Sequence, residues 1–67
     1  MMAGAAVDAS GTLRREGGGF VLDGDDGRRL RLELARVPVD AVEKRVRVLG
    51  TALSDDCVEV DGVARLG

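Results

Sequence analysis

The sequence predicts an all-β domain, a small barrel of five short strands. Apolar and charged residues alternate with a period of two over residues 28–35 and 45–48, the pattern of strands with one buried face. Ten glycines and a single proline are typical of tight turns between such strands. The apolar residues, 45% of the chain, are mostly Val, Leu and Ala, so the predicted core is aliphatic.

The first two strands are separated by glycines. Residues 11–15 form the first strand, with Leu13 directed inward, and residues 20–22 form the second. The three glycines at 17–19 can adopt the positive φ that a hairpin reversal requires. A second turn is predicted at residues 23–27, because Asp-Gly pairs are a strong hairpin signal.

The third strand is predicted at residues 28–35. Its three leucines share one face and its charged residues share the other, whereas a helix would scatter the leucines around its surface. Pro38 ends the pairing of this strand, since proline lacks the N–H that a ladder needs. Residues 40–44 are expected to form one helical turn, with Asp40 as its N-cap.

The fourth strand is predicted at residues 45–53 and the fifth at residues 57–61, joined by a turn at 54–56. In the fourth strand two valines lie inward, but the apolar phase then changes at Gly50. A bulge or bend at Gly50 is therefore expected, which would bring Leu53 to the inner face.

A short helical element between the third and fourth of five strands indicates a Greek-key barrel of OB type. The alternative is an SH3-like barrel, which usually lacks the connecting helix. With 67 residues the chain is expected to hold one domain, at residues 11–67, after a flexible segment at residues 1–10 that runs into strand at about Val7.

The same residues resemble a family, the short bacterial OB-fold proteins of unknown function. The resemblance is carried by Gly-Thr-Leu at 11–13, Gly-Gly-x-Phe-x-Leu at 17–22, and Arg-Val-Arg-Val-x-Gly-Thr at 45–51. It extends over residues 11 to 61, and it departs from the family at residues 54–56, where aromatic residues are often found. The resemblance implies the fold and carries over no active site.

Enzyme activity is not expected, because the chain has no His, the usual general base and the commonest metal ligand. The single Cys57 cannot form an internal disulfide, and it is interpreted as a packing or edge residue. The aspartates of residues 23–27 lack the spacing and flanking helices of a calcium loop, and the glycines at 17–19 lack the helix of a phosphate loop. We expect no metal and no cofactor.

We expect a non-enzymatic binding or accessory module that acts in protein–protein interaction or self-association. The alternative is single-stranded nucleic-acid binding, since OB barrels bind single strands across their second and third strands. A net charge of −2 and a lack of aromatic residues disfavour that alternative. The candidate binding face consists of strand arginines and the single aromatic residue: Arg14, Arg29, Arg31, Arg45, Arg47 and Phe20.

Whether the strand arginines are neutralised by nearby carboxylates distinguishes the two functions. If Glu33, Glu43 and Glu59 pair across strands with the arginines, the face is a solvated, neutral one. No segment approaches the roughly 20 apolar residues of a membrane helix, so no membrane partner is expected. A cytoplasmic location is expected by default.

Overall fold

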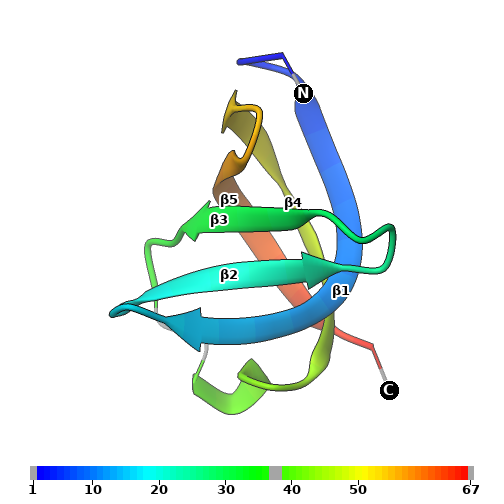
Figure 1. Ribbon diagram of the computed structural model, residues 1–67, viewed down its shortest axis with the longest axis vertical. Helices are drawn as coiled ribbons and strands as arrows, with labels where there is room; N and C mark the ends of the chain where they lie inside the picture. The colour runs from blue at the N-terminus through cyan, green and yellow to red at the C-terminus, as the bar shows by residue number, and fades with distance from the viewer. Residues whose placement is uncertain (1, 37–38, 67) are drawn as a thin grey trace.

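The computed structural model describes residues 2–36 and 39–66 and shows a closed barrel of five strands (Figure 1). The elements, in chain order, are β1 (Ala6–Glu16), β2 (Gly19–Gly24), β3 (Arg29–Glu33), the 3-10 turn η1 (Val39–Ala41), β4 (Arg45–Ser54) and β5 (Cys57–Arg65). The predicted all-β, five-stranded barrel is confirmed. Pro38, expected to end the third strand, lies outside the described residues, and β3 itself ends at Glu33.

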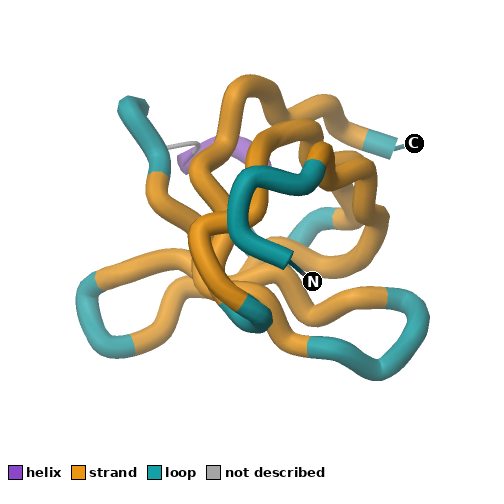
Figure 2. Tube along the Cα trace, turned by 90° about the horizontal axis from the view of Figure 1, so that it is seen from above, coloured by secondary structure: helices purple, strands orange, loops and turns teal. Residues whose placement is uncertain are grey.

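The barrel closes because β1 pairs with both β2 and β4. The remaining neighbours are β2 with β3 and β4 with β5, both antiparallel, and β3 with β5, which is parallel. The parallel contact is short and joins residues 31–33 to residues 57–59. Figure 2 shows the strands curving around one another with the turns at the periphery.

β1 serves two neighbours because it bends near Gly11. Residues 6–12 pair with β4, and residues 11–16 pair with β2. A Cβ at Gly11 would lie 2.2 Å from the carbonyl oxygen of Asp23, so only glycine allows this approach. β1 begins at Ala6, and Val7 is buried in the core at 7% exposure. Residues 6–10 therefore belong to the barrel, so the flexible segment predicted at residues 1–10 is too long, whereas the strand expected from about Val7 is present.

β4 keeps a single inner face from Val46 to Ala52, and Leu53 is the extra residue of an irregularity before Ser54. Ala52 is buried at 1% exposure, whereas Leu49 is 43% and Leu53 46% exposed. The predicted change of phase, with Leu53 moving inside, is therefore wrong. The sequence suggested it because Leu49 and Leu53 are apolar, yet both lie on the outer surface.

The irregularity near Gly50 belongs to β5. Leu49 pairs with Gly62 but Gly50 pairs with Val60, so Asp61 is the extra residue of a bulge. Gly50 is required for close approach, because a Cβ there would lie 2.2 Å from the carbonyl oxygen of Glu59.

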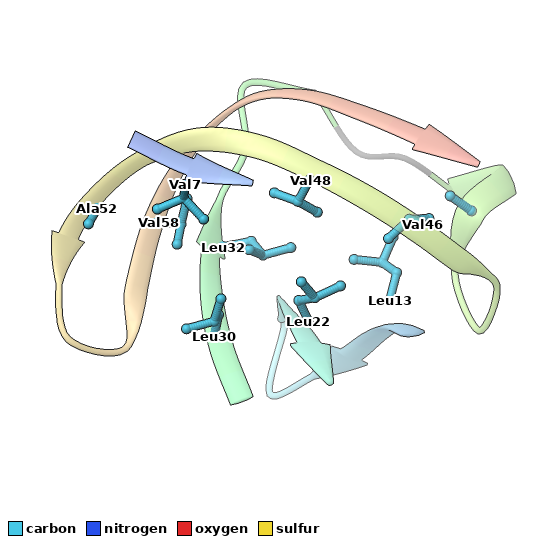
Figure 3. Packing of buried hydrophobic residues seen from close by; sticks show 10 residues of the cluster. Val7, Leu13, Leu22, Leu30, Leu32, Val46, Val48, Ala52 and Val58 are labelled. Atoms are coloured by element: carbon cyan, nitrogen blue, oxygen red, sulfur yellow. The ribbon is translucent and has the colours of Figure 1, made fainter. Parts of the chain in front are cut away.

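The core is aliphatic and every strand contributes to it (Figure 3). Five side chains within it are completely buried: Leu13, Leu22, Val46, Val48 and Val58. Ala41 of η1 is also buried. Of the helical turn predicted over residues 40–44, only the short 3-10 turn η1 at residues 39–41 is formed. After it, Glu43 adopts a positive φ of 66°, and its N–H donates to the carbonyl of Leu13 at 2.6 Å, which ties the connector to β1.

Candidate functional site

Three of the predicted binding residues share the outer face of β1, β2 and β3. Arg14 lies opposite Val21, which in turn lies opposite Arg31. The next outward residue of β2, Asp23, lies opposite Arg29. Residues directly opposite one another in an antiparallel pair project to the same side of the sheet. These five residues define what we call the β2–β3 face.

Two arginines of the β2–β3 face are held by carboxylates. The Nε atom of Arg14 lies 3.2 Å from Oδ2 of Asp23, and its Nη1 atom lies 3.2 Å from Oε1 of Glu43. Arg29 forms an ion pair with Glu16. Exposed ion pairs of this kind contribute only about 0–1 kcal/mol each to stability. Their main effect here is to cancel positive charge on the face.

Arg31 differs from its neighbours. It is exposed, and within the described ranges its side chain forms no ion pair or hydrogen bond. Its backbone is fixed nonetheless, since its N–H donates to the carbonyl of Asp56 at 2.7 Å. The β2–β3 face therefore presents one uncompensated guanidinium at a defined position.

An open hollow of about 560 Å³ adjoins Arg31. Its lining carries charges of both signs and one aliphatic side chain of the face. The lining residues include Arg29, Arg31, Glu16, Glu33, Asp56, Val21, Leu32 and Phe20. A ligand here would meet a mixed surface and not a continuous positive groove.

Arg45 and Arg47 lie elsewhere, on the outer side of β4. They pair in register with Thr12 and Ser10 of β1, so β1 separates them from β2 and β3. Arg45 forms an ion pair with Asp25. The predicted arginines are therefore divided between two surfaces, and the structure does not bring all five together.

Arg47 makes the most specific ion pair of the barrel with Asp8. Its Nε atom donates to Oδ1 at 2.8 Å and its Nη2 atom to Oδ2 at 2.6 Å, a bidentate arrangement that joins β4 to β1. Hydrogen bonding from the guanidinium, helped by its charge, lowers the pKa of Asp8 below its usual value. The same hydrogen bonds raise the pKa of Arg47.

Phe20 lies on the inner side of β2 and packs against the core. It stands opposite Leu32, which is buried. The sequence held the signal for this placement, because Phe20 is two residues from the inward Leu22. Phe20 is only partly buried, however, and it also lines the hollow beside Arg31.

Sequence reasoning found only one of the carboxylates that hold the arginines. Glu43 pairs with Arg14 as anticipated, whereas Glu33 and Glu59 form no ion pair in the part of the chain that the structure describes. The residues it missed lie far from their partners along the chain: Asp8, Glu16, Asp23 and Asp25.

The three aspartates of residues 23–27 have different hydrogen-bond partners. The Oδ1 atom of Asp26 accepts the N–H of Arg28 at 2.9 Å, which is a local turn interaction. Asp23 and Asp25 pair with arginines of β1 and β4. Among residues 2–36 and 39–66, no three His, Cys, Asp or Glu side chains gather in a way that could hold a metal ion.

Cys57 is half-buried at the start of β5, opposite Arg31 across the parallel contact.

Within the described residues no helix is long and apolar enough to cross a membrane.

The fold and its surfaces define a small closed β-barrel in which four of the five predicted arginines form ion pairs with carboxylates. The chain matches the model of a family described as "Protein of unknown function (DUF5818)" over residues 10–66, and it belongs to that family. The predicted membership in an uncharacterised family is thereby confirmed. No curated protein and no solved structure matches the chain.

Proposed function

We propose that this protein is a non-enzymatic binding module built on an OB-type barrel, and that its β2–β3 face binds an acidic segment of a protein partner. The OB type is supported by the strand order β1-β2-β3-β5-β4, closed by the pairing of β1 with β4. A connector with a short 3-10 turn between β3 and β4 also agrees with it. In barrels of this type the second and third strands form the usual binding face.

The observation that carries the proposal is the uncompensated guanidinium of Arg31. A planar guanidinium binds a carboxylate through two parallel hydrogen bonds, which gives both strength and orientation. Val21 adds apolar contact beside it, and the hollow gives access. The neighbouring pairs of Arg14 with Asp23 and of Arg29 with Glu16 offer donors and acceptors to a polar peptide backbone.

Single-stranded nucleic acid is the alternative ligand of the same face. In its favour, Arg14, Arg29 and Arg31 do share one side of the sheet. Against it, two of these three arginines are already held by carboxylates. Each base that stacks on an aromatic side chain contributes about 1–3 kcal/mol, and the chain has a single aromatic residue, Phe20, which is partly buried against the core and lines the hollow beside Arg31.

The test is a titration followed by two-dimensional NMR. The probes are a short peptide of alternating Glu and Val, the same peptide with Gln in place of Glu, and an oligothymidine at about 50 mM salt. We expect the Glu peptide alone to shift the signals of β2 and β3, and the shifts to disappear in Arg31→Gln. The matched control is Arg15→Gln, which removes an exposed arginine outside this face and leaves binding unchanged. Saturable binding of the oligothymidine without the Glu peptide, or no binding of either probe, overturns the proposal.

A further inference from the structure

One edge of β5 is only partly covered. β4 pairs with β5 along its whole length, but β3 pairs with it only at residues 57–59. β3 ends at Glu33, so in the described part of the chain no strand pairs with the other edge of β5 over residues 60–65. In Figure 1, β5 continues from behind β3 toward the C-terminus.

The backbone of this segment points alternately to β4 and to the open edge. The N–H of Leu66 donates to the carbonyl of Arg45 at 2.9 Å, so Leu66 faces β4. Because the direction alternates along an antiparallel strand, Ala64 also faces β4, whereas Val63 and Arg65 direct their N–H and C=O groups outward. Unpaired groups in such a row are a template for another strand.

The charges along this edge are self-complementary. When two copies of β5 run antiparallel with Val63 opposite Val63, Asp61 of each copy lies opposite Arg65 of the other. Both residues are exposed, and neither forms an ion pair in the described part of its own chain. In this register the paired residues are ones whose backbone groups are free to pair. Those of Val63 and Arg65 point outward, and the bulge leaves Asp61 outside the ladder with β4. A shift of two residues would remove both ion pairs.

We propose that residues 61–65 of β5 pair antiparallel with the same residues of a second copy, which forms a two-fold symmetric dimer. An open hollow of about 450 Å³ between β5 and residues 34–36 leaves room along this edge. The proposal does not depend on the β2–β3 face, which lies on other strands. A five-residue contact is small, so we expect a weak dimer with a dissociation constant on the order of 100 µM.

The test uses sedimentation velocity from micromolar to millimolar protein, with two charge variants. Asp61→Arg and Arg65→Asp each place like charges opposite one another in the homodimer, so each should associate about tenfold more weakly than the wild type. An equimolar mixture of the two variants restores both ion pairs and should associate as strongly as the wild type. If a different protein pairs with this edge, the wild type should remain monomeric at millimolar protein, and that result overturns the proposal. Equal association of all samples, or a mixture no stronger than either variant alone, also overturns it.

A proline substitution tests the backbone pairing separately from the charges. Val63→Pro removes an N–H that faces the open edge, so the barrel should stay folded by circular dichroism while the dimer is lost. Ala64→Pro removes an N–H that faces β4 and should lower the melting temperature strongly. A folded Val63→Pro variant that still dimerises refutes pairing along this edge.

Discussion

Replacing Gly50 with alanine perturbs the barrel where the backbones of β4 and β5 approach closely. The new Cβ would lie 2.2 Å from the carbonyl oxygen of Glu59, a distance that real Cβ atoms essentially never show. It would also lie 3.0 Å from Cγ1 of Val58, which is tighter than most real contacts. β4 must therefore move away from β5, which strains the ladder and the packing of a fully buried valine. Overpacking and weakened hydrogen bonds together should cost about 2–4 kcal/mol.

The assay is thermal unfolding followed by circular dichroism, with urea unfolding as a second measure. A loss of 1 kcal/mol lowers the melting temperature of a domain of this size by about 4–8 °C, so Gly50→Ala should lower it by at least about 10 °C. The matched control is Gly62→Ala in β5, where a Cβ would meet no atom within 4 Å. We expect the control to keep the wild-type melting temperature. Equal melting temperatures for the two variants would refute the close approach of β4 and β5.

Three further predictions concern the core, the ion pairs and the bend of β1. Leu13→Ala leaves a cavity at a fully buried site and should lower the free energy of unfolding by about 2–5 kcal/mol. Leu53→Ala lies on the outer surface and should change that free energy by less than about 0.5 kcal/mol. Similar urea midpoints for the two variants would contradict the assignment of Leu13 to the inner face and Leu53 to the outer face. Pairing with Arg47 makes the pKa of Asp8 lower in the folded protein than in the unfolded chain, where it is about 3.9. The ion pair therefore stabilises the protein fully above the unfolded pKa, and this stabilisation is lost as the pH falls through the folded pKa. Urea midpoints measured across this acidic range should therefore fall less steeply with decreasing pH in Asp8→Asn than in the wild type, and identical slopes would argue against the bidentate pair. Gly11→Ala should destabilise β1 as strongly as Gly50→Ala destabilises β4, because its Cβ would also lie 2.2 Å from a carbonyl oxygen; a wild-type melting temperature would show that β1 does not bend there.

The period of two correctly predicted which face of a strand lies inside wherever the strand was regular. Leu30 and Leu32 are buried, as the alternation of the third strand indicated, and Val46 and Val48 are completely buried. The alternation gave the wrong face for Leu53. An apolar residue on the outer surface of a small barrel suggests, from the sequence alone, that the inward-facing positions of the strand have shifted by one. The bulge that suggested a bend in β4 lies in β5, at Asp61, where the local signals are Gly62 and the change of apolar phase between Val60 and Val63, which both pack against the core.

The candidate site was predictable only in part. The alternation of charged residues placed Arg29 and Arg31 on one outer face, and the structure agrees. The partners of the arginines depend on which strands are neighbours and in which register, and these are long-range properties. Arg47 pairs with Asp8, which lies 39 residues earlier in the chain, so the alternation within one strand could not reveal that this charge is neutralised.

The uncompensated charge of Arg31 is the basis of the proposed function, and its guanidinium can be observed directly. The measurement is the Nε–H signal of each arginine by NMR while the alternating Glu-Val peptide is added. We predict a saturable shift of the Arg31 signal, with smaller changes for Arg14 and Arg29, whose side chains already have carboxylate partners. An Arg31 signal that stays fixed at millimolar peptide would show that this guanidinium does not bind the peptide carboxylates.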